Sequence, residues 1–295
     1  MRVAKGDEKL WTILNDKLDT LRGTGHLTEA IRVAETATEL AQRAFPAGDP
    51  AHALSLEKLG QLHDQAGDRK AARLHLIRAH ELLTGANPPD ERAVYRSARR
   101  LAFLSDDLGL TDDAISFYEM AVEAGTHLNT IRHSDLGTML NNIALIYRKT
   151  GRQEAAEPYY LRALDLYQKH LGPEHADVAS VLNNLAVFYT NEKRFAEAET
   201  AHQRALAMRE KLLAAGHPDI AQSQCNLAVV YHSRGELARA AELYRASLKT
   251  WEEMGDKPPA DYEIVASNYA DLLRSLGKRR QARQLEERAR SRRRA

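Results

Sequence analysis

Apolar residues recur along this chain with helical spacing almost everywhere, and few windows alternate as a strand requires. The clearest stretch runs from Leu182 to Leu206 and predicts two short amphipathic helices joined by a tight turn. The same pattern returns 42 residues earlier, from Leu140 to Leu164, and 42 residues later, from Gln224 to Leu248. A fixed period of this size predicts an all-α repeat architecture.

The repeat phase is set by a small residue in the first helix, Ala186. Steps of 42 residues from it reach Leu18, Gly60, Ala102, Ala144, Ala228 and Ala270. Seven residues after each of these lies a turn position, which is glycine in every repeat except one, where Lys193 stands. Glycine suits a helix end because it adopts a left-handed backbone without a Cβ clash.

A second small position lies in the second helix of each repeat and is alanine throughout. A small residue at such a position lets the two helices of a hairpin cross closely. The alanines of this column are Ala30, Ala72, Ala114, Ala156, Ala198, Ala240 and Ala282.

The order of small, aromatic, glycine and alanine positions resembles the tetratricopeptide repeat, a helical hairpin usually 34 residues long. The longer period, the linker LGPEHADVA (Leu171–Ala179) and the LNNLA sequence resemble the 42-residue repeats of kinesin light chains. The resemblance implies a right-handed superhelical solenoid of seven helix-turn-helix hairpins in a single domain, residues 1–295. The repeats are expected at about residues 11–52, 53–94, 95–136, 137–178, 179–220, 221–262 and 263–295.

Composition narrows the class of protein. A net charge of +1 disfavours a general nucleic-acid binder, which usually carries a basic excess. The single cysteine excludes an internal disulfide and fits a reducing compartment. The sequence has neither a signal peptide nor an apolar run long enough to span a membrane, so we expect a cytoplasmic protein.

The residue two positions before the phasing alanine is asparagine in four consecutive repeats: Asn142, Asn184, Asn226 and Asn268. We call these four residues the asparagine ladder. Helix propensity does not explain them, because asparagine is a mediocre helix former. The resemblance implies that they face a concave groove and hydrogen-bond an extended peptide, whose backbone an amide matches with a donor and an acceptor. The alternative is that each asparagine ties neighbouring repeats together.

Helical spacing predicts the neighbours of the ladder on the same face. Asn141 and Asn183 add amides, and Leu145, Val187 and Val229 form an apolar line. A positive wall for acidic partner residues or a free carboxylate is predicted at its edge; as an alternative, these charges are only solvated. The cations are Arg96, Arg99, Arg100, Arg148 and Lys149.

The linkers keep the same phase. Asp135, Asp177, Asp219 and Asp261 precede helical runs, where an aspartate would accept a hydrogen bond from a free N–H group. Histidines also recur, at 133, 175 and 217, but one repeat apart they lie too far from each other to share a metal ion.

Other chemistry finds little support in the sequence. Cys225 has no histidine within hydrogen-bond reach, and His63, His75 and His80 lack the spacing of a metal motif. We therefore expect no catalytic residues, no metal and no cofactor. The basic segment Lys278 to Arg294 is interpreted as a solvated capping helix; the alternative is that it contacts RNA, DNA or an anionic membrane face.

Together these features predict a non-catalytic scaffold or adaptor that holds an extended peptide or a helix, with a protein partner and no small-molecule substrate. A regulator that sequesters an enzyme or transcription factor, or that self-assembles, is the first alternative. A nucleic-acid-binding helical repeat is the second, disfavoured because the in-phase groove residue is neutral. The oligomeric state and the partner's identity are left open.

Overall fold

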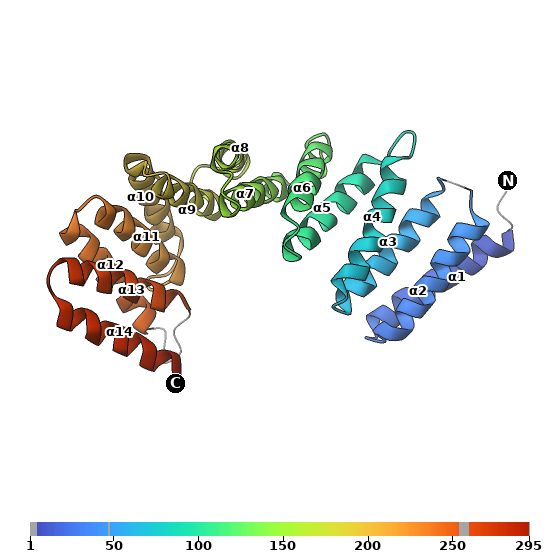
Figure 1. Ribbon diagram of the computed structural model, residues 1–295. Helices are drawn as coiled ribbons and strands as arrows, with labels where there is room; N and C mark the ends of the chain where they lie inside the picture. Colours follow the sequence, from blue (N-terminus) through green and yellow to red (C-terminus); the bar gives the residue numbers. More distant parts are fainter. Residues whose placement is uncertain (1–4, 47, 254–259, 295) are drawn as a thin grey trace. The chain divides into compact units, whose positions relative to one another are not determined.

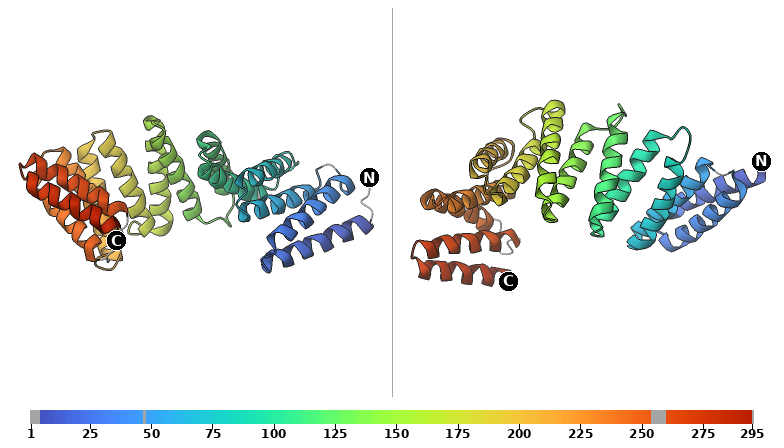
Figure 2. Two further views of the ribbon diagram at one scale, coloured as in Figure 1. Left: turned by 60° about the horizontal axis from the view of Figure 1, so that its bottom comes forward. Right: turned by 45° about the horizontal axis from the view of Figure 1, so that its top comes forward.

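The computed structural model describes residues 5–46, 48–253 and 260–294, and within them the chain is all-α, with fourteen helices and no strand. Consecutive helices form antiparallel pairs joined by short turns (Figures 1 and 2). This arrangement confirms the predicted helical hairpins. The helices are α1 (Lys5–Gly23), α2 (Leu27–Ala44), α3 (Pro50–Gln65), α4 (Arg69–Thr84), α5 (Glu91–Asp107), α6 (Thr111–Thr126), α7 (His133–Lys149), α8 (Gln153–Leu171), α9 (Ala176–Asn191), α10 (Phe195–Leu212), α11 (Pro218–Ser233), α12 (Leu237–Glu253), α13 (Ala260–Ser275) and α14 (Arg279–Arg294).

The chain forms two compact units, residues 1–146 and 147–295, whose boundary falls within α7. In the first unit, α1 to α6 make three hairpins, and the second helix of one hairpin packs on the first helix of the next. In the second unit, α9 to α14 repeat this arrangement and α8 packs on α9. Each hairpin thus buries its apolar face against a neighbour, as repeat proteins do.

The close helix crossings lie where the small residues predicted them. All seven alanines of the column have no exposed surface. Gly60 occupies the phasing position of the second repeat, and a Cβ atom there would lie 2.7 Å from Cγ of Leu76. Any larger residue at these positions would force the helices of a hairpin apart.

The turn glycines adopt the left-handed backbone that the sequence predicts, with φ between 73° and 84° from Gly25 to Gly277. Lys193 takes the same conformation with φ of 59° and is the only non-glycine residue with positive φ in the described part of the chain. The tertiary fold therefore imposes on a lysine a conformation that L-residues disfavour.

A repeated cluster of polar side chains ties neighbouring hairpins of the second unit together. The Tyr189 hydroxyl donates to Glu157 (2.9 Å), and Arg194 binds the same carboxylate through two N–H groups and lies over the tyrosine ring. Arg194 holds the pKa of Glu157 below its usual range. One repeat later Tyr231 donates to Glu199 in the same way (2.9 Å).

The linker histidines, rather than the aspartates, accept the capping hydrogen bonds. Nδ1 of His175 accepts from the backbone N–H of Asp177 at 3.2 Å, and His217 does the same for Asp219 at 3.1 Å. The aspartates lie inside the first helical turn, where their charge favours the helix dipole. The sequence-based assignment of the cap to the aspartates was wrong at these two helices.

His202 occupies a core position that is tyrosine in neighbouring repeats, as at Tyr160 and Tyr244. It is 1% exposed, and its Nδ1 has no hydrogen-bond partner among the described residues. Burial, with a smaller effect of the Arg209 cation, lowers the pKa of His202 to about 3. His202 is therefore neutral in the folded state at physiological pH.

Replacing Lys193 by glycine is expected to stabilise the protein by up to about 1 kcal/mol, because glycine adopts positive φ without a Cβ clash. Urea unfolding followed by circular dichroism measures the effect. The control is Gly235→Lys at the equivalent turn of the next repeat, which is expected to destabilise. Equal stability of all three proteins would contradict the strain assigned to Lys193.

His202→Tyr is expected to reduce the loss of stability in acid. The folded pKa of His202 lies below the unfolded value of about 6.5, so its contribution is present above pH 6.5 and is lost as the pH falls from there toward 3. Through this one group the free energy of unfolding falls by at most about 1.4 kcal/mol per pH unit. Urea unfolding at pH 7.5 and 5.5, read from Trp251 fluorescence in a Trp11→Phe background, measures it. Parallel pH profiles of the two proteins would contradict this assignment.

Candidate peptide-binding face

The asparagine ladder lies on the first helices of successive hairpins. Asn184, Asn226 and Asn268 belong to α9, α11 and α13 of the second unit, and Asn142 belongs to α7 in the first unit. All four side chains are half-buried. The four asparagines lie at equivalent places because each occupies the same position in its 42-residue repeat and so on its helix.

Within each unit, ladder asparagines hydrogen-bond to the preceding repeat. Nδ2 of Asn226 donates to Oδ1 of Asn183, 43 residues back, at 3.0 Å. Nδ2 of Asn142 donates to the hydroxyl of Tyr118 in α6 at 3.1 Å. The alternative of an inter-repeat tie is therefore realised at Asn226 and Asn142.

A tie of this kind leaves part of each amide available. An asparagine side chain has two N–H donors and a carbonyl oxygen with two lone pairs. The bond from Asn226 to Asn183 uses one of its donors. The remaining groups of a half-buried amide suffice for one donor and one acceptor contact to a peptide backbone.

The residues one position before the ladder differ in exposure. Asn141 is half-buried, whereas Asn183 is 6% exposed and Cys225 5% exposed. Burial raises the pKa of the Cys225 thiol to about 12, so the thiol stays protonated at neutral pH. The structure thus makes Asn183 a support for Asn226 and leaves Cys225 in the core.

The predicted apolar line is half-buried in both units. Leu145 lies in the first unit, and Val187 and Val229 lie in the second, with Val229 packed against the core around Tyr244 and Leu272. Each side chain keeps some surface beside its ladder asparagine. An apolar strip next to amides fits a peptide that places alternate side chains toward the protein.

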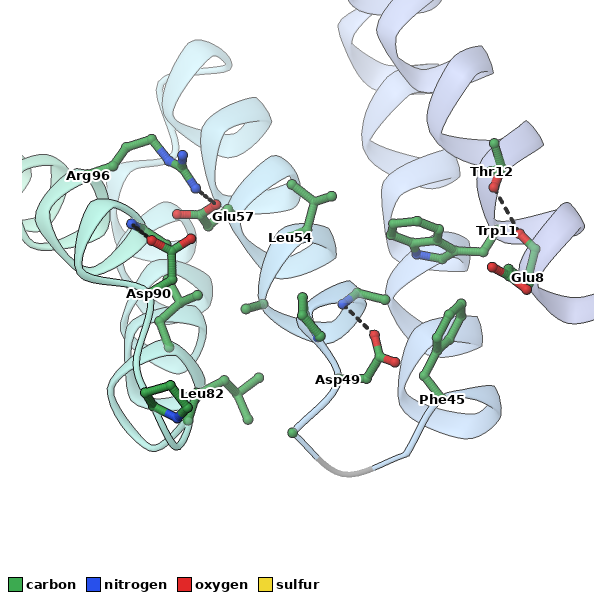
Figure 3. Close-up of a pocket in the computed structure, with 18 residues that line it drawn as sticks. Glu8, Trp11, Thr12, Phe45, Asp49, Leu54, Glu57, Leu82, Asp90 and Arg96 are labelled. Carbon is green, nitrogen blue, oxygen red and sulfur yellow. Dashed lines mark hydrogen bonds and ion pairs between the residues drawn. The ribbon is translucent and has the colours of Figure 1, made fainter. Parts of the chain in front are cut away.

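The cations of the first unit are less free than the sequence suggests. Arg96 pairs with Glu57 at 3.2 Å (Figure 3), and Glu57 is 5% exposed. Arg99 is exposed and lies over the Phe103 ring at 5.5 Å. Burial lowers the pKa of the half-buried Arg100. Arg99 therefore keeps the most accessible charge of the three.

The other two cations belong to the second unit. Arg148 is half-buried and lies near the fully buried Tyr160. Burial raises the pKa of the Tyr160 hydroxyl, and the Arg148 cation offsets part of that rise. Lys149 is exposed at the end of α7. The five predicted cations thus belong to two units, three to the first and two to the second.

The remaining candidates for chemistry do not assemble a site. The described residues contain no group of three or more His, Cys, Asp or Glu side chains arranged to hold a metal ion. His63 and His75 stack at 5.3 Å, whereas His80 bonds to Ser97.

No helix in the described ranges is long and apolar enough to cross a membrane. Near the basic end, Arg288 pairs with Glu252.

Two tetratricopeptide-repeat family models match the chain, over residues 136–177 and 177–253. A 142-residue stretch is 27% identical to the protein KINESIN LIGHT CHAIN-RELATED 3 of Arabidopsis thaliana, covering 48% of this chain and 22% of that protein. The chain therefore matches about a fifth of the length of this relative.

Solved structures show the same repeats. BtubC (BKLC) from P. vanneervenii is 28% identical, with a TM-score of 0.59 over 77% of this chain and 92% of that one. Aspartyl phosphate phosphatase F from Bacillus subtilis shares the fold at 16% identity, with a TM-score of 0.53 over 93% of this chain and 69% of that one.

Cys225 is expected to resist thiol reagents in the folded protein, because burial keeps it protonated and covered. Reaction with DTNB at pH 8 measures this: the native protein should react at least a hundredfold more slowly than the protein in 8 M urea. Rapid labelling of the native protein would show that Cys225 is accessible on the binding face.

Proposed function

Because this chain is a tetratricopeptide-repeat protein with repeats similar to those of kinesin light chains, we propose that it binds an extended peptide or a helix along the first helices of its hairpins. The repeats support a protein-interaction scaffold function, and proteins of this kind are generally non-enzymatic. We propose no catalytic residue or cofactor, and the lone, buried cysteine is compatible with a cytoplasmic location.

The observation that carries this proposal is the half-buried asparagine ladder beside an apolar line. In the second unit, the contact set is Asn184, Val187, Asn226, Val229 and Asn268, each on the first helix of a hairpin. The amides would bond the peptide backbone without reading its sequence, while the valines would contact its apolar side chains. Asn141, Asn142 and Leu145 would make the corresponding contacts within the first unit.

The cations supply the proposed preference for acidic residues or a free carboxylate in the partner. Arg96 is exposed but paired with Glu57, whereas Arg99 and Lys149 are exposed cations outside that pair, so they carry this part of the proposal. Exposed cations act mainly on the rate of association and are screened by salt.

Replacing Asn226 by alanine is expected to weaken partner binding about tenfold or more, since one hydrogen bond to a partially buried amide is worth about 1.4 kcal/mol or a factor of ten. Affinity capture from lysate of the source cells with mass spectrometry identifies the partner, and calorimetry measures its affinity. A mass measurement at several concentrations separates self-assembly from partner binding.

The matched control is Asn183→Ala, which breaks the same hydrogen bond from its other side but leaves the Asn226 amide in place. Partner binding is expected to survive in this variant. If both variants lower the melting temperature and neither changes the affinity, the ladder is only a tie between repeats.

A further inference from the structure

The first unit contains a cavity of about 600 Å³ that the asparagine ladder does not touch (Figure 3). Its lining residues belong to the first three hairpins: to α1, α3, α4 and α5, and to the segments that follow α2 and α4. Its size is in the range of ligand-binding pockets, about 300–1,000 Å³. Its lining includes Trp11, Phe45, Leu54, Glu8, Asp49 and Asp90.

One wall of the cavity is aromatic. The Trp11 and Phe45 rings meet edge to face at 5.5 Å, and the indole is oriented by a 2.8 Å hydrogen bond from Nε1 to Oγ of Ser55. Leu54 stands opposite and is 39% exposed, and Leu82 lies across the cavity. An oriented aromatic pair facing an exposed leucine offers a preformed place for a large apolar side chain.

The charge of the cavity is acidic, with four carboxylates and one guanidinium. Glu57 is paired with Arg96. Asp49 and Asp90 cap α3 and α5 by accepting backbone N–H groups through Oδ1 only. No ion pair involves Asp49, Asp90 or Glu8 among the described residues, so their carboxylates attract a cation.

Three residues that line the cavity occupy the same position in successive repeats of the first unit. Thr12, Leu54 and Arg96 are in phase with one another, and each lies four residues, about one helical turn, before the ladder position of its own repeat. The repeat phase therefore already placed these three residues on one helical face. Threonine, leucine and arginine differ too much in chemistry for the sequence alone to indicate a binding site there. A chain segment lying on the first helices of this unit would reach the cavity.

We propose that the cavity docks a segment of a partner protein in which a large apolar side chain stands next to lysine or arginine. The apolar side chain lies between Trp11, Phe45 and Leu54. The cationic side chains face the carboxylates that line the cavity, with Asp49 next to Phe45, and Asp90 and Glu8 on opposite sides (Figure 3). This site does not depend on the ladder, and its preference is opposite in sign to that proposed for Arg99 and Lys149.

The test uses the full chain with Trp251→Phe, which leaves Trp11 as the sole tryptophan. The probe is a fluorescein-labelled peptide, Gly-Ser-Leu-Phe-Lys-Lys-Ser-Gly, followed by anisotropy, with an unlabelled copy for Trp11 emission. Its comparison peptides carry Glu-Glu for Lys-Lys or Ala-Ala for Leu-Phe. Binding of the first peptide at least tenfold tighter than either, with a shift in Trp11 emission, is the expected result.

Two variants locate the binding. Leu54→Arg is expected to abolish it, whereas Leu74→Arg, at a more exposed leucine outside the cavity, should leave it unchanged. The triple change Glu8→Gln, Asp49→Asn, Asp90→Asn removes charge while asparagine preserves both caps. It should reduce the preference for the basic over the acidic peptide by at least fivefold.

The proposal is overturned if no peptide binds at 1 mM, if the acidic peptide binds as well as the basic one, or if Leu54→Arg has no effect. Binding of 2-phenylethylammonium as tight as that of the peptide would also overturn it, since the site would then serve a small organic cation. Asn226→Ala should leave peptide binding in the cavity unchanged, so failure of the ladder hypothesis is distinguishable from failure here.

Discussion

The close crossing of two helices at a buried alanine is the constraint on which each hairpin depends. The alanine column from Ala30 to Ala282 has no exposed surface at any of its seven positions. Because the helices meet backbone to backbone there, the turn that joins them must reverse within a few residues. That demand is strong enough to hold Lys193 at positive φ.

Because the hairpins stack, ladder asparagines can tie neighbouring repeats together and also offer groups for the proposed peptide contact. The bond from Asn226 to Asn183 shows that the ladder helps to set the register between repeats. An amide is suited to this double use because it has more hydrogen-bonding groups than one tie consumes. The cluster of Tyr189, Glu157 and Arg194 ties α8 to α9, so the ladder is not the sole polar link between repeats.

The electrostatic surface depends on contacts that a repeat pattern does not reveal. Arg96 looked like part of a positive wall, but it is paired with the nearly buried Glu57 and lines an acidic, apolar-walled cavity. Glu57 comes from the preceding repeat, where no cation occupies the equivalent position. Because Arg96 is paired across repeats, carboxylates are in excess around this cavity.

The sequence by itself determined the hairpins, the phase, the turn conformation and the core, because close packing and positive φ each restrict a position to few residue types. It also placed the ladder on the first helices. Only the tertiary structure decided which side chains share hydrogen bonds and charges: His175 rather than Asp177 caps α9, and Asn183 is buried beneath Asn226. Such pairing depends on atoms brought within about 3 Å across different helices, and polar residue types alone are compatible with many partners.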